Sequence, residues 1–219
     1  MATGSNYPNS LDSWSNKTTA DQLTPTDVNQ RSSALEKIES YINSSAVFLG
    51  LRPLVTAVAS SSNTVDFTST YINSNYDAYF VTMTGVVPAT SGSALTARLS
   101  IANVFQIGGS DYQNTLFYNA DGGAMSVAGS ASAFAGLAYL LSNTAGRIYD
   151  GSFWFFNPAR DVTFKLMMWD GVFNTGSCVR VAGGATYHTG TDTIDAIRFL
   201  MNAGAISKGT FTLYGLRRD

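Results

Sequence analysis

The sequence predicts a mainly β protein: an antiparallel β-sandwich of jelly-roll type, preceded by an extended N-terminal arm and one α-helix. Three observations support this fold class. Short apolar runs with period-two alternation recur from residue 46 to residue 219. Turn signals rich in Gly and Asp separate these runs, as they do between short strands. No stretch of helical periodicity lies between consecutive runs, which disfavours parallel βαβ units and favours an antiparallel sandwich.

Alternating residues predict which side of each strand faces the core, because successive side chains point to opposite faces. The sets expected to face inward are Tyr79/Val81/Met83, Leu95/Ala97/Leu99/Ile101, Val162/Phe164/Leu166/Met168, Ile197/Phe199/Met201 and Phe211/Leu213. The residues expected to face outward are Thr96, Arg98, Ser100, Thr163 and Lys165. The stretch from Val127 to Leu141 is ambiguous, because its alanines allow a helix while its glycines and serines favour strand and loop.

The first 23 residues form the expected arm. They are rich in Ser, Asn and Thr and show no apolar periodicity. Leu11 and Trp14 are the best candidates for anchoring this arm to a larger particle. The alternative is that Trp14 folds back on its own domain.

A helix is expected over residues 24–43. Thr24 suits the N-cap, Pro25 suits the first helical turn, and Asp27 can complete a capping box. An apolar stripe with coiled-coil spacing follows and predicts an oligomer seam. Its members are Val28, Leu35, Ile38 and Ile42. Packing of this helix on its own β-domain, residues 46–219, is an equally supported interpretation, because an isolated helix of this length is marginal in water.

Composition excludes several classes of protein. Only 13% of residues are charged and the net charge is −2, so the basic stripe that nucleic-acid binding needs is missing. The single cysteine, Cys178, excludes an intrachain disulfide. No run reaches the length of a membrane span, and no signal peptide is recognised. We therefore expect synthesis in a cytosol, with no insertion into a membrane.

Catalytic and metal-binding signatures are missing from the sequence. The only histidine, His188, lies among turn residues, so a zinc site lacks the ligands it needs. Most aspartates adjoin turns, where their side chains cap the backbone; Asp195, near Arg198, is expected to form a buried pair or an edge charge. We expect no enzyme activity, no cofactor and no metal ion. A glycan hydrolase with an Asp pair assembled in space remains an alternative.

Aromatic residues supply the best surface candidates. The run Phe153-Trp154-Phe155-Phe156 cannot face one side of a strand, so two of its members must point away from the core. Trp169, with Met167, is expected on the outer face of its strand. Trp154 and Trp169 are therefore predicted surface or ligand aromatics. Packing against another chain element is favoured over stacking on a sugar.

Several segments resemble virion structural proteins of tailed bacteriophages. The N-terminal segments Leu11-Asp12-Ser13-Trp14-Ser15, Leu23-Thr24-Pro25-Thr26-Asp27-Val28-Asn29 and Ala34-Leu35-Glu36 resemble the attachment regions of their fibres. Two β-strand segments resemble parts of their jelly-roll domains: Tyr76-Asp77-Ala78-Tyr79 and the closing run Gly209-Thr210-Phe211-Thr212-Leu213-Tyr214-Gly215-Leu216.

This resemblance implies a virion component, usually a homotrimer, whose N-terminus docks on other virion proteins and whose β-domain projects. The chain lacks the repetitive shaft of long fibres and the large β-helix of tailspikes. The resemblance thus implies a short fibre, or a tail, neck or head appendage, with a receptor- or carbohydrate-binding adhesin at the tail tip as the alternative. A host surface glycan is a partner only in that alternative.

Overall fold

The computed structural model describes residues 50–120, 126–161, 163–187, 190 and 192–217. The expected arm and helix lie outside these residues, and so do the anchors Leu11 and Trp14 and the seam residues Val28, Leu35, Ile38 and Ile42. His188 also lies outside them. The described residues belong to a compact unit that spans Phe48–Asp219.

The described part of the chain is mainly β, as predicted, and its regular structure consists of thirteen strands. In chain order these are β1 (Leu51–Ser62), β2 (Thr64–Phe67), β3 (Tyr76–Pro88), β4 (Ser93–Ile101), β5 (Val104–Phe105), β6 (Tyr112–Ala120), β7 (Ser126–Ser132), β8 (Ala135–Leu141), β9 (Tyr149–Phe156), β10 (Lys165–Asn174), β11 (Cys178–Tyr187), β12 (Ala196–Met201) and β13 (Ile206–Arg217). The ambiguous stretch from Val127 to Leu141 thus lies in β7 and β8.

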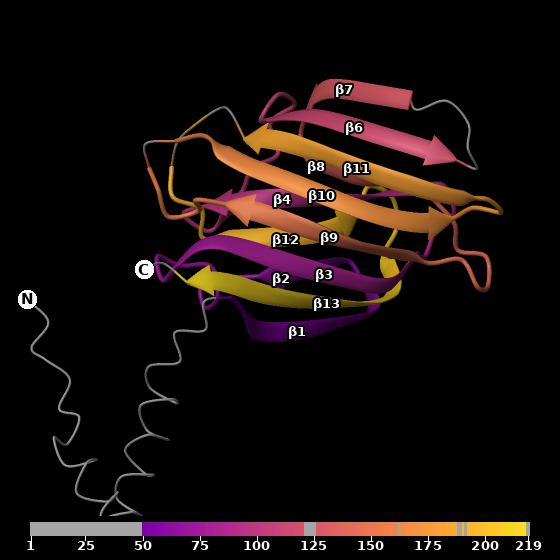
Figure 1. Cartoon of the computed structure of the whole chain (residues 1–219), viewed down its shortest axis with the longest axis horizontal. Helices are drawn as coiled ribbons and strands as arrows, with labels where there is room; N and C mark the ends of the chain where they lie inside the picture. The colour runs from indigo at the N-terminus through magenta and orange to yellow at the C-terminus, as the bar shows by residue number, and fades with distance from the viewer. Residues whose placement is uncertain (1–49, 121–125, 162, 188–189, 191, 218–219) are drawn as a thin grey trace, which may run out of the picture. The chain divides into compact units, whose positions relative to one another are not determined.

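Two antiparallel sheets hold these strands. The larger has eight strands in the order β1-β13-β3-β9-β10-β11-β6-β7. The smaller has the order β2-β12-β4-β5, and β8 also pairs with β4. In Figure 1 the eight-stranded sheet faces the viewer and the smaller sheet lies behind it.

One hydrophobic core unites the two sheets, an arrangement consistent with a β-sandwich. The larger sheet contributes Val81 and Phe153, and the smaller contributes Leu95 and Phe199, all fully buried. The rings of Phe153 and Phe199 meet edge to face with centroids 5.4 Å apart. Burial confirms the inward orientation predicted for Tyr79, Val81, Met83, Leu95, Ala97, Leu99, Ile197, Phe199, Met201, Phe211 and Leu213.

The predicted orientation of β10 is wrong. Met167 and Trp169 are buried in the core, whereas Leu166 and Met168 are exposed on the outer face. Phe164, which precedes the strand and is also predicted to face inward, is 53% exposed. Val162 lies outside the described residues. Lys165 also faces inward and is buried, contrary to the prediction. Its amine donates a hydrogen bond to the backbone carbonyl of Arg160, and burial lowers the pKa of that amine.

The outward prediction for β4 also fails at two positions. Thr96 and Ser100 are buried, although they alternate with core residues along β4, which has paired strands on both sides. The Thr96 hydroxyl donates to the carbonyl oxygen of Leu200 at 3.1 Å. On the other side Thr96 pairs with Gly136, against which the Tyr139 ring packs. Polar alternation therefore does not guarantee exposure in this strand.

Glycines make room for large aromatic side chains on the inner face of the eight-stranded sheet. Trp169 lies directly opposite Gly183 on β11. A Cβ atom at Gly183 would lie 2.5 Å from Cζ2 of Trp169 and 2.6 Å from the carbonyl oxygen of Thr115. Tyr149 lies in the same way over Gly171, where a Cβ atom would meet its ring at 2.6 Å.

Buried tyrosines differ in how their hydroxyls are satisfied. The Tyr79 hydroxyl accepts from the N–H of Asn73 at 2.7 Å and donates to the carbonyl oxygen of Tyr71 at 2.9 Å. The Tyr149 hydroxyl has no hydrogen-bond partner in the described part of the chain. Burial raises the pKa of Tyr79 to about 12 and raises the pKa of Tyr149 as well.

We predict that Gly183→Ala destabilises the protein by about 1–3 kcal/mol, the usual range for overpacking a close-packed core. The Thr115 carbonyl is backbone and cannot rotate away, so the strand itself must shift. Urea unfolding measures the difference in free energy. The matched control is Gly184→Ala on the same strand, where the nearest atom would be 3.3 Å away. Equal losses in the two variants would contradict the packing described for Trp169.

We predict opposite effects for two removals of a buried hydroxyl. Tyr79→Phe leaves buried backbone groups unpaired and is expected to cost about 1–2 kcal/mol. Tyr149→Phe removes a polar atom that lacks a partner, so stability is expected to stay equal or to rise by about 1 kcal/mol. Thermal unfolding of both variants provides the comparison. A loss for Tyr149→Phe as large as that for Tyr79→Phe would mean that the Tyr149 hydroxyl is hydrogen-bonded.

Candidate functional site

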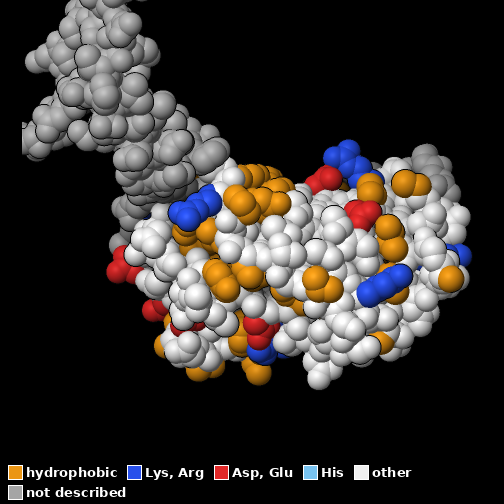
Figure 2. Space-filling view, turned by 90° about the horizontal axis from the view of Figure 1, so that it is seen from below, with side chains coloured by type: hydrophobic (Ala, Val, Ile, Leu, Met, Phe, Trp, Pro, Cys, Tyr) orange, Lys and Arg blue, Asp and Glu red, His pale blue; other side chains and the backbone are white. Residues whose placement is uncertain are grey.

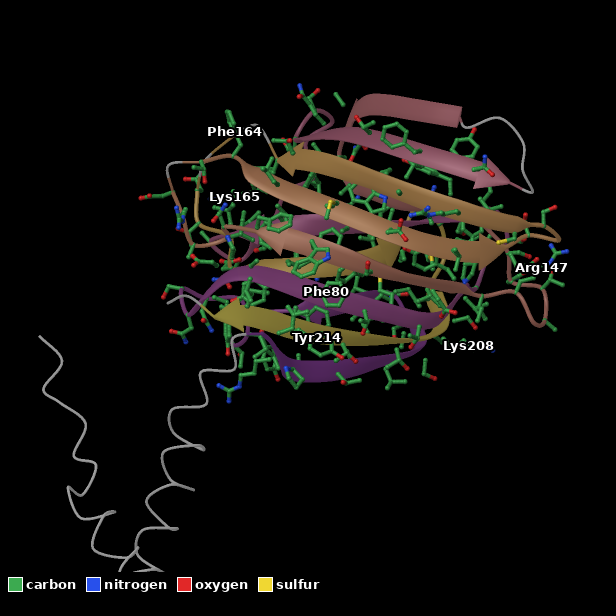
Figure 3. All side chains as sticks on the ribbon, in the orientation of Figure 1. Phe80, Arg147, Phe164, Lys165, Lys208 and Tyr214 are labelled. Atoms are coloured by element: carbon green, nitrogen blue, oxygen red, sulfur yellow. The ribbon has the colours of Figure 1, made fainter. Side chains whose placement is uncertain are left out.

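The outer face of the eight-stranded sheet carries a cluster of large apolar side chains on four neighbouring strands. We call this cluster the outer patch; its members are Phe80, Trp154, Phe156, Leu166, Met168 and Tyr214. They alternate along β3, β9, β10 and β13 with residues that are buried in the core. Figure 3 labels Phe80 and Tyr214 on adjacent strands of the sheet that faces the viewer.

Strand register aligns the patch into two rows. Tyr214 lies opposite Phe80, Phe80 lies opposite Trp154, and Trp154 lies opposite Met168. In the neighbouring row, Phe156 lies opposite Leu166. Directly opposed side chains on one face of a sheet are within contact distance. The register therefore turns four separate sequence segments into one surface.

Ring contacts hold the centre of the patch in place. The Phe80 and Trp154 ring centroids are 4.5 Å apart, and those of Phe80 and Tyr214 are 5.9 Å apart. Trp154 and Phe156 are nearly parallel, with an interplanar angle of 3° and centroids 6.0 Å apart. Such pairs contribute about 0.5–1.5 kcal/mol beyond their buried area. The aromatic rings thus support each other and form a stable platform.

The margin of the patch is open to solvent. Leu166 is 50% exposed and Met168 is 51% exposed, whereas the four aromatic members are partly buried by one another. Grouped apolar side chains on an outer face are a marker of interaction sites, in contrast to single exposed ones. The patch is therefore the best candidate for a binding surface in the described part of the chain.

A polar row borders the patch on the same face. Thr82, Ser152 and Asp170 lie opposite one another on β3, β9 and β10. Each is two residues along its strand from a member of the Phe80–Trp154–Met168 row, which corresponds to about 7 Å. Asp170 accepts a hydrogen bond from Arg180 at 2.9 Å, and both side chains are exposed. The face therefore combines stacking rings with hydrogen-bonding groups at its border.

The two predicted surface tryptophans have different positions. Trp154 lies on the outer face with Phe156, whereas Phe153 and Phe155 are buried, which agrees with the alternation expected for that run. Trp169 is only 1% exposed and belongs to the core. The prediction that places Trp169 on the surface is wrong, because Gly183 leaves space for the indole on the inner side.

On the smaller sheet, an arginine joins an acid and an aromatic ring. Arg198 of β12 donates two hydrogen bonds to Asp66 of β2, at 2.8 and 2.6 Å, and its guanidinium lies 3.8 Å from the centroid of the Phe105 ring. The hydrogen bond to Asp66 raises the pKa of the guanidinium. Asp195, expected near Arg198, instead accepts from the N–H of Asn103 at 2.7 Å. These contacts link the strands β12, β2 and β5.

The acidic side chains within the described ranges are not grouped as metal ligands. No group of three or more His, Cys, Asp or Glu side chains there has the arrangement that would hold a metal ion. The carboxylate of Asp150 accepts from the N–H of Gly85 at 2.6 Å, and that of Asp111 accepts from Gly108 at 2.6 Å. Both acids satisfy backbone donors, but only Asp111 does so within its own turn. Asp150 instead holds a residue of another strand, β3, so the local capping expected of it is not what the structure has.

In the described part of the chain, no helix has the length and apolar character needed to cross a bilayer.

Comparisons with known proteins do not assign a family or a function to the chain. No family model, no curated protein and no solved structure matches it. The outer patch is therefore identified only from the positions and contacts of its own residues.

Of the outer-patch residues, only Trp154 is predicted from the sequence as a surface candidate. Phe80 and Tyr214 carry a local signal, since each alternates with residues correctly placed in the core, Tyr79 and Val81 in one case and Leu213 in the other. Their adjacency carries no local signal. It depends on the pairing of β3 with β13, the last strand of the chain.

We predict a measurable coupling between Phe80 and Trp154. In a double-mutant cycle with Phe80→Leu and Trp154→Leu, the coupling energy is expected to be about 0.5–1.5 kcal/mol. Urea unfolding supplies the four free energies. The control cycle combines Phe80→Leu with Phe117→Leu, on the distant strand β6 of the same sheet, and is expected to be additive. Additivity in both cycles would contradict the ring contact.

Proposed function

We propose that this chain is a non-enzymatic structural component of a tailed-bacteriophage particle, such as a short fibre or a tail, neck or head appendage. Residues 1–23 dock it on other virion proteins through Leu11 and Trp14. Residues 24–43 join copies, with a trimer favoured, through Val28, Leu35, Ile38 and Ile42. The β-region projects from the particle as a jelly-roll-like sandwich whose outer patch contacts a neighbouring virion protein.

The observation that carries this proposal is the outer patch. Its apolar rows cover four adjacent strands and end in the half-exposed side chains of Leu166 and Met168. Burying such a surface against a partner removes apolar area from water, which is the main driving force of protein association. The low charge of the chain, 13% of residues, agrees with a surface partly covered in an assembly.

A second candidate function is binding of a carbohydrate, as expected of an adhesin at a tail tip. The observation in its favour is the polar row beside the aromatic rings. The apolar face of a sugar ring can stack on Trp154 while its hydroxyl groups reach Ser152 and Asp170, about 7 Å along the strands. The absence of any binding in a glycan screen at concentrations up to the millimolar range would count against this candidate.

The structural proposal is tested by particle incorporation. We expect Met168→Glu to lower the amount of the protein in purified particles by tenfold or more. A carboxylate left unpaired in a protein contact costs more than the about 1.4 kcal/mol that corresponds to a tenfold loss. Immunoblots of particles, together with gold labelling by an antibody against residues 46–219, give the amount and the position.

The matched control is Val172→Glu, on the same strand and the same face but outside the patch. Val172 is 45% exposed, close to the value for Met168, so both substitutions are expected to leave folding nearly unchanged. Equal incorporation of the two variants would contradict a role for the patch. Absence of the parent protein from every particle would contradict the virion assignment itself.

A further inference from the structure

Among the described residues, β1 is an edge strand of the eight-stranded sheet. In the part of the chain that the structure describes, β1 pairs with β13 and with no other strand. It is 12 residues long, so one side of its backbone presents a long row of N–H and C=O groups. Such an edge is a template for pairing with another extended strand.

The features that interrupt regular edge pairing lie at the two ends of β1: near its C-terminal end, Ser61 has a left-handed backbone with a φ of 52°. Arg52, Pro53 and a bulge between Pro53 and Val55 lie at its start. From Leu54 to Ser62 the strand has no charged residue and no proline. Natural edge strands are typically blocked by charges, prolines or bulges along their length. The main part of β1 therefore retains a pairing surface.

Val58 marks the centre of this surface. Its side chain is 72% exposed, more than any other large apolar side chain whose burial is described. It lies on the outer face of the sheet with Thr56 and Ser60, while Ala59 is buried on the inner face. Figure 2 views the molecule from the side on which β1 lies in Figure 1, and charged side chains there are few and separated.

We propose that β1 pairs with β1 of a second copy of this chain, antiparallel and about a twofold axis at Val58. The eight-stranded sheet then continues from one copy into the next. This contact adds an interface that the proposed seam at residues 24–43 does not provide, and it does not depend on the assignment to a phage particle.

The sequence of β1 is compatible with itself in this register. Val58 meets Val58 of the second copy, Thr56 meets Ser60, and Ala57 meets Ala59. Apolar and small hydroxyl-bearing residues thus oppose their own kind, and no like charges face each other, which is the unfavourable case in cross-strand pairs. Arg52 falls opposite position 64, beyond the end of the partner's β1. A twofold contact of one surface with itself is the commonest arrangement in homo-oligomers.

Disulfide trapping in the full chain tests both the contact and its register. Val58→Cys is made in a Cys178→Ser background, so that the native thiol does not react. After oxidation at low micromolar concentration, we expect most of the protein to migrate as a disulfide-linked dimer. Directly opposed Cβ atoms are about 4.5–5.5 Å apart, and a disulfide needs about 3.5–4.5 Å, so small strand motions suffice.

The control for accidental reaction is Ile107→Cys in the same background. Ile107 is 63% exposed and precedes β6, which lies near the opposite end of the eight-stranded sheet from β1. A Val58→Cys dimer no more abundant than the Ile107→Cys dimer would overturn the contact. The register is tested by Thr56→Cys and Ser60→Cys, which are expected to cross-link when mixed and to react poorly alone. Preferential self-linking of either variant would overturn the register.

A charge at the axis gives an independent readout. Val58→Lys places the ammonium groups of the two copies opposite each other, and their repulsion is expected to separate the copies and halve the native mass in light scattering. Ile107→Lys is expected to leave the mass unchanged. The unfolding midpoint of Val58→Lys monitors folding separately. An unchanged native mass for Val58→Lys would also overturn the proposal.

Discussion

The alternation of side chains along β9 and β10 is the constraint on which the rest of the structure depends. These strands lie in the middle of the eight-stranded sheet, and bulky side chains stand on both of their faces at Phe153–Phe156 and Leu166–Trp169. The inner face accepts Trp169 and Tyr149 only because Gly183 and Gly171 lack a Cβ atom where these rings lie. Shifting either strand by one residue would exchange its two faces, so the glycines select the register in which Trp169 is inside.

The same register determines what the outer face presents. Once Phe153, Phe155, Met167 and Trp169 occupy the core, the residues between them must point outward, and these are also apolar. Antiparallel sheets with one solvated face normally carry polar residues there. The outer patch is therefore a departure from ordinary sheet composition, and contact with a partner is the physical reason we propose for it. The edge of β1 is a second departure, since most of its length lacks charge and proline.

Sequence alone could predict the strands and much of the core, because period-two alternation is a local property. It placed Tyr79, Val81, Phe199 and Phe211 correctly and required two residues of Phe153–Phe156 to point outward. It failed at Trp169, where the face is decided by Gly183 on another strand. It also failed at Thr96, whose hydroxyl is buried and bonds to the carbonyl oxygen of Leu200 on the neighbouring strand β12. The patch could be predicted only at Trp154, since its other members meet through pairing of distant segments.

The positions of Trp154 and Trp169 on opposite faces of one sheet can be measured directly. Fluorine NMR of the full chain labelled with 5-fluorotryptophan, assigned with single Trp→Phe variants, reports the solvent exposure of each indole through its shift between H2O and D2O. We expect a clear solvent shift for Trp154 and essentially none for Trp169. A solvent-sensitive Trp169 resonance, or a Trp154 resonance that does not respond, would contradict the register of β9 and β10.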